Sequence, residues 1–524
     1  MNAPPRAVVV GSGIGGSALA LLLADAGIPT TLLEKNRRIG GSCSGYEKQG
    51  FTIDIGTHMF CRGPKGPLGD VLRRVGEDGA IAFRRTRDIA EIRFPAKKDV
   101  PRAVRVPAEL WRMPRFALDL ARELRLSPRD AARAGRLFTH ILTMSDEEVA
   151  RWDDRTIEDF IAPYVDHPPT VGIFGFLLGL YFILPYWQVS AGEALLCFRR
   201  MARDNFLSYP KGGSIAIPGT FVRLAQARGA DVRTDCGVRR IVVEGGRTRG
   251  VELTDGTFVP ASIVVSTSSL RTTVTRLVGA AEFPEEYVAR VLAIQGSFIA
   301  VQAKIGLRRR LGDAGAIVGG VGDDVDLRSI SRGDLRAMFD RVAQGEIPPL
   351  VPFYCPVPSN FDPDLAPPGH QLLTVCAVAP TSAVTLKDPG PAWEEAMLRT
   401  LRRVVPGLDE NTLFVDRFGV DFIEKWIGKE FGPAVSTGQT PSQVGARRPP
   451  VHTPIRGLYA AGCCAGGRGV GTELAAASAM ECADRILADL GHGLRHTRDG
   501  RAKRSRKWLE SQVARPLAWA TRAG

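Results

Sequence analysis

Three glycines near the start of the chain have the spacing of a turn that binds phosphate. Gly11, Gly13 and Gly16 lie in "VVVGSGIGGSALALLL", where valines precede the turn and a helix-forming run follows it. The first glycine allows a tight turn, the second lets a pyrophosphate approach the backbone, and the third lets helix and strand pack closely. Free N–H groups at the helix start would face the phosphates. The pattern, which also includes Gly15, predicts a dinucleotide-binding turn.

An acidic residue follows the second apolar stretch. Glu34 comes directly after "TTLL", where a carboxylate can accept a hydrogen bond from a ribose hydroxyl. A negative charge there disfavours a 2′-phosphate, so NADP is not expected at this site. The alternative, a glycine turn with a solvated glutamate, is disfavoured because the turn lies between a strand and a helix.

The residues after Glu34 distinguish FAD from NAD. Lys35 and Arg38 precede Gly40, Gly41 and Ser42, and "GFTIDIG" follows at positions 50–56. This extended pattern resembles the FAD signature of a large flavoprotein family that includes amine oxidases, protoporphyrinogen oxidase, phytoene desaturases, carotenoid isomerases and retinol saturases. The resemblance implies an FAD site made by Gly11, Gly13, Gly15, Gly16, Glu34, Lys35, Arg38, Gly40, Gly41, Ser42, Gly56, Thr57, His58 and Val238.

A second glycine-rich block lies near the other end of the chain. "GLYAAGCCAGGRGVGTEL", residues 457–474, resembles the last strand of that family and the turn that faces the flavin ring. The resemblance adds Gly462, Cys463, Gly469, Val470 and Gly471 to the FAD site. A helix that begins there would stabilise negative charge on the reduced ring.

Cys463 departs from the family pattern, which usually has an aspartate at that position. The ribityl or phosphate contact that the aspartate makes is therefore left open. We expect Cys463 and Cys464 to be small buried residues rather than redox-active thiols.

Several stretches resemble one branch of the family, that of phytoene desaturases, carotenoid isomerases and retinol saturases. They are "GFTIDIGTHMF", "YPKGGSIAIPGTF", and Gln443 with Arg448-Pro449. The resemblance implies an FAD-dependent oxidoreductase that introduces or saturates carbon–carbon double bonds in a carotenoid or polyisoprenoid, with oxygen or a quinone as electron acceptor. Two alternatives stay open: a redox-neutral carotenoid isomerase that uses reduced FAD, and a flavin-free prenyl or lipid escort protein.

Two residues are candidates for handling the proton that a desaturation releases. His58 lies in the loop expected on the flavin side, and Glu473 lies in the first turn of the C-terminal helix. The alternatives are a structural histidine and an acid that only favours the helix dipole. No metal site is expected, because the seven histidines are isolated and the nine cysteines include no CxxC pair. The cysteines and the lack of a signal peptide favour a reducing, cytoplasmic location.

Two segments carry the whole net charge of +13. Residues 84–136 contain 15 Lys/Arg and seven Asp/Glu, and residues 495–524 contain nine and two. Both interleave basic residues with tryptophan and leucine, a pattern typical of helices at an anionic membrane surface. We expect peripheral membrane association; the alternative is a solvated basic face with a disordered tail. The sequence contains no recognised nucleic-acid-binding module.

The chain reads as an α/β protein in several discontinuous parts. The apolar run 170–185 is shorter than the roughly 20 residues of a membrane-spanning helix, so we expect a tunnel wall, a membrane-dipping element or a buried core helix. The prediction is a Rossmann-like FAD-binding domain, a discontinuous α+β substrate domain and a helical, membrane-facing part. The predicted boundaries are 1–76, 205–270 and 436–490 for FAD binding, 77–204 for a helical, basic region that faces substrate or membrane, 271–435 for substrate binding and 491–524 for a basic tail.

Overall fold

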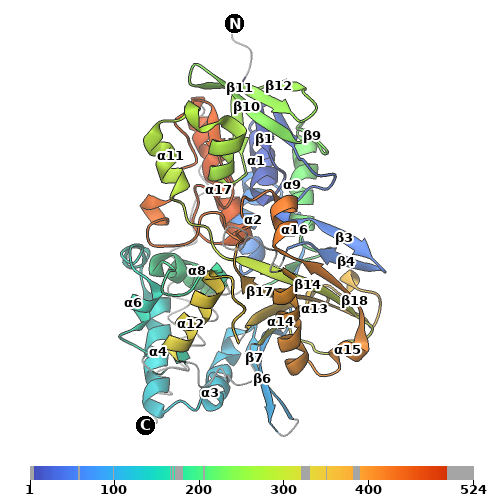
Figure 1. The fold of residues 1–524 in the computed structure, drawn as a ribbon, viewed down its shortest axis with the longest axis vertical. Helices are drawn as coiled ribbons and strands as arrows, with labels where there is room; N and C mark the ends of the chain where they lie inside the picture. Colours follow the sequence, from blue (N-terminus) through green and yellow to red (C-terminus); the bar gives the residue numbers. More distant parts are fainter. Residues whose placement is uncertain are drawn as a thin grey trace.

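Five short parallel strands form the sheet that carries the first glycine turn (Figure 1). The computed structural model describes residues 5–56, 59–97, 100–165, 167, 170–171, 181–204, 207–319, 331–349, 351–381 and 390–491. In sheet order the strands are β19 (Leu458–Ala460), β13 (Ile263–Ser266), β1 (Ala7–Val10), β2 (Thr30–Leu33) and β9 (Asp231–Arg233). The three inner strands consist mainly of buried Val, Ala and Leu, because helices cover one face of the sheet and a small antiparallel sheet with further helices covers the other.

Helix α1 (Ile14–Asp25) lies at the centre of this part. It packs against α9 (Ala216–Ala227) and α17 (Gly471–Asp489), and α17 also contacts α2 (Pro67–Arg74). The sequence predicts one apolar face for α1, yet its leucines are buried on every side because two helices flank it. Gly27 and Pro29 follow the helix end as expected.

Turn residues at 244–246 and 255–256 predict a β-meander after residue 231, and this prediction is confirmed. The meander is the antiparallel sheet β10 (Val238–Glu244), β11 (Arg247–Leu253) and β12 (Phe258–Pro260). The chain then returns to the five-stranded sheet as β13 and continues through the helices α10 (Leu270–Thr272) and α11 (Glu285–Leu292).

A second, seven-stranded sheet forms the lower right of Figure 1. Its order is β18 (Thr412–Phe418), β14 (Ile299–Leu307), β17 (Gln371–Ala379), β16 (Phe353–Pro356), β15 (Ala316–Gly319), β6 (Asp88–Lys97) and β7 (Val100–Pro107). Helix α14 (Gly390–Val404) packs on it. Two short helices precede strands of this sheet, α13 (Pro358–Phe361) before β17 and α15 (Leu408–Asn411) before β18, and α16 (Val420–Ile427) follows β18.

The prediction of helices from residue 84 onward is wrong for β6 and β7. Prolines at this spacing suggest breaks between helices, but Pro101 and Pro107 lie in β7, the outermost strand, where a missing N–H is tolerated. Ile92, Phe94 and Val104 form a small buried cluster of this hairpin. The segment thus belongs partly to the second sheet.

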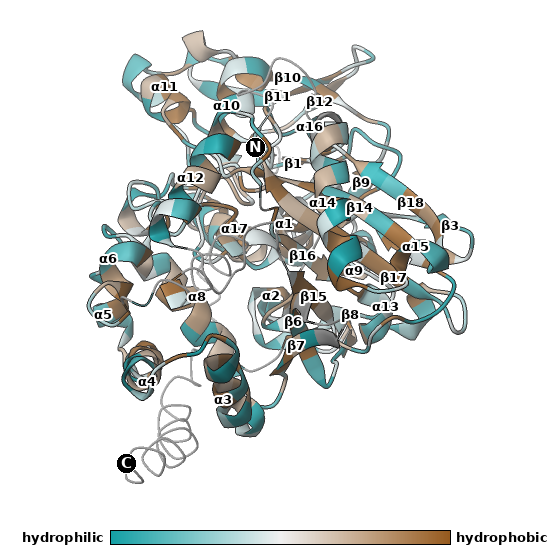
Figure 2. Ribbon diagram, turned by 60° about the horizontal axis from the view of Figure 1, so that its bottom comes forward, coloured by the Kyte–Doolittle hydropathy of each residue, from teal (hydrophilic) through white to brown (hydrophobic). Residues whose placement is uncertain are grey.

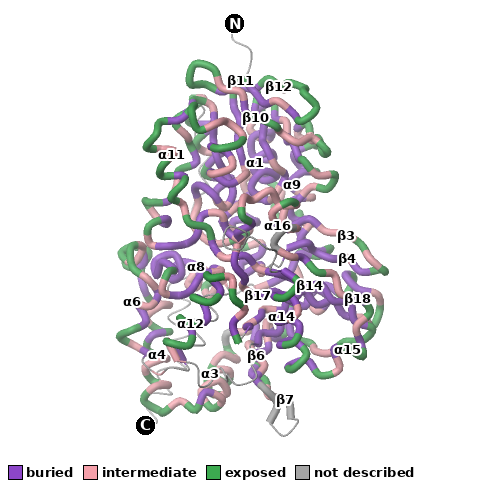
Figure 3. The backbone as a smooth tube through the Cα atoms, in the orientation of Figure 1, coloured by how far each residue is buried: buried purple, intermediate pink, exposed green. Residues whose placement is uncertain are grey.

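Helices do follow from residue 113, at the lower left of Figure 1. They are α3 (Met113–Glu123), α4 (Pro128–Thr143), α5 (Asp146–Ala150), α6 (Ile157–Ile161), α8 (Ala191–Asp204) and α12 (Arg332–Ala343). Helices α4, α5 and α6 contact α8. Figure 3 shows α3 and α4 as largely exposed or half-buried, and Figure 2 shows apolar residues among their polar ones.

Part of the apolar run 170–185 lies outside the described residues, as does the basic tail from residue 492. Within the ranges given above, no helix combines the length and apolar character that crossing a bilayer requires. Two small strand pairs complete the fold: β3 (Gly45–Lys48) with β4 (Phe51–Asp54), and β5 (Phe83–Arg84) with β8 (Tyr209–Pro210). The predicted domain boundaries and the membrane-facing role stay predictions.

Candidate functional site

The turn between β1 and α1 leaves open space beside one glycine. Gly11 has a φ of +98°, which favours glycine. A Cβ on Gly16 would lie 1.9 Å from the carbonyl oxygen of Gly11, and one on Gly15 would lie 2.9 Å from Cα of Gly462. At Gly13, by contrast, a Cβ would meet no atom of the described residues within 4 Å. This is the space that an approaching phosphate needs.

The start of α1 is suited to an anion. Among the described residues, no side chain caps the helix at Gly13, and its first turn contains no acidic residue. No acidic side chain of the helix itself thus competes for its first N–H groups at the positive end of its dipole. A pyrophosphate fits this position.

Glu34 is buried at the end of β2, with 4% of its surface exposed. Its Oε2 accepts hydrogen bonds from the Ser12 amide (3.0 Å) and hydroxyl (2.6 Å), and its Oε1 accepts one from the Asn36 amide (2.9 Å). Since each carboxylate oxygen can accept two hydrogen bonds, Oε1 can still accept one from a ribose hydroxyl.

The two basic residues that follow contact protein backbone. Nζ of Lys35 donates to the Lys425 carbonyl (2.6 Å), and Nη1 of Arg38 donates to the Gly45 carbonyl (2.9 Å). Burial lowers the pKa of Lys35, although Glu34 opposes that shift. Their predicted cofactor contacts stay predictions.

The glycine pair after Arg38 passes over the phosphate turn. A Cβ on Gly41 would lie 3.2 Å from Cα of Gly13. The Ser42 carbonyl accepts from the Gly56 amide (3.0 Å), which brings Gly56 beside the pair formed by Gly40 and Gly41. Thr57 and His58, predicted to follow there, lie outside the described residues.

Val238 begins β10 close to Glu34. The Cys236 amide, two residues earlier, donates to the Glu34 carbonyl (2.8 Å). The fold therefore brings the start of the meander to the end of strand β2, where the ribose of a dinucleotide is expected. The sequence alone gave no spacing that links these segments.

Asp54 joins the two motifs on which the resemblance to one branch rests. Its carboxylate accepts from the Tyr209 hydroxyl and from the Ser214 amide (2.9 Å to Oδ1). A Cβ on Gly213 would lie 2.9 Å from Oδ1, so this position favours glycine. Asp54 thus holds "YPKGGS" against "GFTIDIG".

The C-terminal glycine loop lies against the same turn. Gly462 touches Gly15, as described above, and α17 begins at Gly471 after Val470. Arg448 is buried and fixes the loop: Nε donates to the Gly466 carbonyl (2.6 Å) and Nη2 to the Cys463 carbonyl (2.9 Å). Burial lowers the pKa of Arg448. The sequence indicates Arg448 only as part of the resemblance to one branch of the family. Its role in anchoring the loop depends on the fold.

The two adjacent cysteines differ. Cys464 is buried as expected, whereas Cys463 is only partly buried. Burial opposes ionisation of the Cys463 thiol, but Lys429 and the Ser436 backbone outweigh burial, so its pKa lies below the ordinary value. Its predicted place beside the cofactor stays a prediction.

Glu473 lies in the first turn of α17 and contacts a residue near the Gly56 loop. Its Oε1 accepts from the Arg62 amide (3.0 Å), and Nε of Arg62 pairs with Asp204 (2.6 Å). Burial raises the pKa of Glu473 to about 7, although Arg62 opposes the shift. The carboxyl group therefore changes charge near neutral pH.

Lys304 is a buried cation that the sequence analysis missed. It lies in β14, and its Nζ donates to the Gly56 carbonyl (3.1 Å) and to Oε1 of Gln302 (2.9 Å). Burial lowers its pKa to about 7. A lysine within the otherwise apolar strand "IAVQAKIGL" was the available signal.

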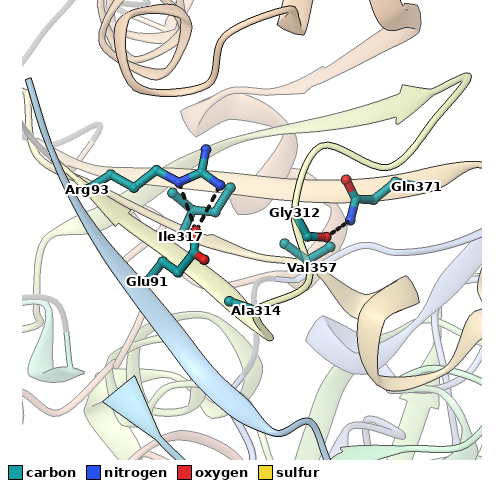
Figure 4. A pocket seen from close by; sticks show the side chains of 7 residues that line it. All are labelled: Glu91, Arg93, Gly312, Ala314, Ile317, Val357 and Gln371. Atoms are coloured by element: carbon teal, nitrogen blue, oxygen red, sulfur yellow. Dashed lines mark hydrogen bonds and ion pairs between the residues drawn. The ribbon is translucent and has the colours of Figure 1, made fainter. Parts of the chain in front are cut away.

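A small cavity elsewhere carries no comparable chemistry (Figure 4). It lies among residues of β6, β15 and the loop at 311–314 and has no room for a water-sized sphere. Its polar side chains are occupied: Arg93 pairs with Glu91 (2.9 Å), and Gln371 donates to the Gly312 carbonyl (2.7 Å).

Comparison with models of known protein families shows which family the chain belongs to. The model of the family described as flavin containing amine oxidoreductase matches residues 14–487. The chain belongs to this family. The assignment confirms the resemblance derived from the glycine turns and the fold class of an α/β protein with a parallel sheet.

Two curated relatives and one solved structure are similar over most of the chain. The prolycopene isomerase of Daucus carota is 24% identical over 93% of this chain and 80% of its own length. The zeta-carotene-forming phytoene desaturase of Myxococcus xanthus is 26% identical over 72% of each chain. An oxidoreductase from Methanosarcina mazei shares the fold, with a TM-score of 0.69, 20% identity, and coverage of 91% of this chain and 99% of that one.

FAD is the cofactor, as predicted. The open space at Gly13, the uncapped start of α1 and the free acceptor position on Glu34 fit its pyrophosphate and ribose. The chain is thus a flavoprotein of a family with carotenoid desaturase and carotenoid isomerase relatives.

Proposed function

We propose that the protein transfers hydride between FAD and a carbon–carbon bond of a carotenoid or other polyisoprenoid, thereby introducing or saturating a double bond. The observation that carries the proposal is the similarity to phytoene desaturases in a chain that has the glycine turn and the buried Glu34 expected of an FAD site. Bound FAD supplies the hydride acceptor or donor, and the protein supplies binding and orientation.

In the desaturating direction, the substrate loses one hydrogen as hydride to FAD and its neighbour as a proton. We assign the proton to the Glu473 carboxylate, since it lies at the turn expected to face the ring and ionises near pH 7. Oxygen or a quinone then takes the two electrons from the cofactor.

A redox-neutral isomerase is the second candidate. The prolycopene isomerase of Daucus carota aligns with 93% of this chain, whereas the desaturase of Myxococcus xanthus aligns with 72%. The third reading, a flavin-free escort, has less support because the phosphate turn and Glu34 are intact.

Product mass separates these readings. The purified flavoprotein is incubated with a panel of phytoene-type polyenes, with oxygen or a quinone present, and the products are analysed by mass spectrometry. Desaturation removes two hydrogen atoms per step, saturation adds two, and isomerisation changes retention without changing mass. A colourless purified protein that binds polyenes unchanged would instead support the escort reading.

We also propose that the helical region binds a membrane surface. Trp111 is 79% exposed and Leu118 is 59% exposed, next to the exposed Arg115 and Arg122 of α3. Exposed apolar and basic side chains together suit the headgroup region of an anionic bilayer. A polyene dissolved in that bilayer would then be close to its enzyme.

A further inference from the structure

Helix α8 is linked at both of its ends to the turn where α17 begins, at one end directly and at the other through Arg62. At its first turn lies Glu193, which is 1% exposed. Its Oε1 accepts from the Gly469 amide (2.5 Å), and its Oε2 accepts from Nε of Arg468 (3.0 Å). One buried carboxylate of the helical region thus binds both a backbone amide and a side chain of the C-terminal glycine loop.

A second carboxylate completes this contact. Nη2 of Arg468 pairs with Oδ1 of Asp153 (2.6 Å), in the turn before α6. Asp153 is held closely, because a Cβ on Gly192 would lie 2.1 Å from its Oδ1 and one on Gly445 would lie 2.3 Å from its Oδ2. The guanidinium group is therefore fixed between two carboxylates of the helical region.

The other end of α8 is linked to the same turn through Arg62. Asp204, the last residue of α8, pairs with Nε of Arg62 (2.6 Å), and both side chains are about nine-tenths buried. The Arg62 amide donates to Glu473 in the first turn of α17 (3.0 Å). The residues just before and just inside the start of α17 are thus held by one helix.

We propose that α8 is a brace that sets the position of the turn formed by residues 468–473, with Glu193 and Asp204 as positioning residues. The inference deepens the proposed function and rests on it only in placing the flavin ring at this turn. A single helix of the 77–204 region would then fix the turn that is expected to face the flavin. Removing either carboxylate would let the turn move and weaken its hold on the cofactor.

The test measures FAD itself and needs no polyene. Glu193→Gln and Asp204→Asn each keep the side-chain shape and remove the charge. We expect each to weaken FAD binding about tenfold, the effect of losing one buried charged hydrogen bond, and to lower the flavin reduction potential. Fluorescence titration gives the FAD dissociation constant, and equilibration with redox dyes gives the potential.

A matched control lies in the same region. Glu158→Gln removes an ion pair between α6 and Arg336 of α12 that does not contact the turn, and it should leave both quantities unchanged. The brace is refuted if Glu193→Gln and Asp204→Asn lower only the unfolding temperature while FAD affinity and potential stay as in the wild type. If Glu193→Gln does not fold, Arg468→Lys is tested in its place, because a lysine lacks the forked guanidinium group that bridges the two carboxylates. Wild-type FAD affinity and flavin potential in Arg468→Lys would equally refute the brace. Since neither measurement uses a substrate, a failed polyene assay does not affect this result.

Discussion

Burial brings the pKa of two side chains around the predicted ring position, Glu473 and Lys304, to about 7 from opposite directions. The carboxyl group lies on α17 and the ammonium group on β14, and they contact backbone close to the Gly56 loop. Removing a charged group from water favours its neutral form, which raises the pKa of an acid and lowers that of a base. Both groups therefore change charge within the physiological range.

Glu473→Gln should abolish one limb of the pH–rate profile. In the wild type we expect turnover to rise with pH through about 7, as the carboxylate that accepts the proton forms. The variant should be slower by roughly 100-fold, the lower range of general acid–base catalysis, and its rate should not depend on pH in that range. Steady-state kinetics with the polyene that proves active provides the measurement.

A stability measurement checks the same group without substrate. Because the folded-state pKa of Glu473 is raised, the folded state keeps a proton that the unfolded state releases, so this contribution to stability falls as pH rises from about 4.5 to about 7. The Gln variant should lack that slope. Glu395→Gln, on the surface of α14, is the control and should keep it. An unchanged pH–rate limb in Glu473→Gln would assign the proton to another group.

Lys304→Met should change how stability depends on pH in the alkaline range. The folded-state pKa is lowered from 10.5 to about 7, so the buried ammonium costs stability that is regained as pH rises from about 7 to about 10.5. The wild type should therefore gain stability relative to the variant across that range, by at most about 1.4 kcal/mol per pH unit. Urea unfolding of both proteins between about pH 6 and pH 10 measures the difference. A constant difference would show that the ammonium keeps its ordinary pKa.

Residues that act through local sequence were predictable, and those that act across the fold were not. The turn at Gly11 and Gly16 follows from spacing, because strand, turn and helix are adjacent in the chain. Lys304 meets Gly56 across 248 positions, and Glu193 meets Arg468 across 275. No spacing rule links such pairs, because the packing of separate parts brings them together.

At the scale of elements, periodicity and turn residues predicted the FAD-binding part well. Strand β1 occurs where expected, because a buried parallel strand is a continuous apolar run. The antiparallel meander occurs where expected, because glycine-containing turns separate its strands. The prediction for the segment 88–107 failed because Pro101 and Pro107 suit an edge strand as well as a helix break. Only the position of this segment in the second sheet decides between an edge strand and a break between helices.

Gly13→Val tests whether the turn at the start of α1 holds the pyrophosphate. The backbone at Gly13 has a φ of −60°, which valine tolerates, so the substitution fills the open space without straining the chain. We expect a folded, colourless apoprotein with at least about a 100-fold loss of FAD affinity, because the phosphate could no longer approach the helix amides. Absorbance at the flavin bands and circular dichroism report occupancy and folding.

The control is another glycine with free space around it. Gly135 lies within α4, where a Cβ would meet no described atom within 4 Å, so Gly135→Ala should keep full flavin content. If Gly13→Val purified yellow with full occupancy, the pyrophosphate would have to bind elsewhere.

At the scale of the whole molecule, three hydrophobic cores correspond to the two large sheets and the helical region. The chain passes between them several times: β9 and β13 return to the first sheet, and β6 joins the second sheet from the N-terminal side. The sequence predicted this discontinuity through its resemblance to known flavoproteins. It did not predict that α8 would join the helical region to the start of α17.

The exposed face of α3 sits at the far end of the molecule from the β-meander (Figure 1). If this face binds anionic membranes, the protein should bind phosphatidylserine vesicles more tightly than neutral ones, and the binding should weaken with salt. Exposed charges are screened beyond about 8–10 Å at physiological ionic strength, which makes their attraction to a charged surface sensitive to added salt.

Trp111→Ser should weaken binding to both kinds of vesicle, because it removes the apolar contact and keeps the charge. Phe258→Ser, an exposed aromatic residue on β12, is the matched control and should bind as the wild type does. Cosedimentation at increasing salt measures these affinities. Equal binding to neutral and anionic vesicles would remove the electrostatic contribution, and unchanged binding of Trp111→Ser would place the membrane contact on another face.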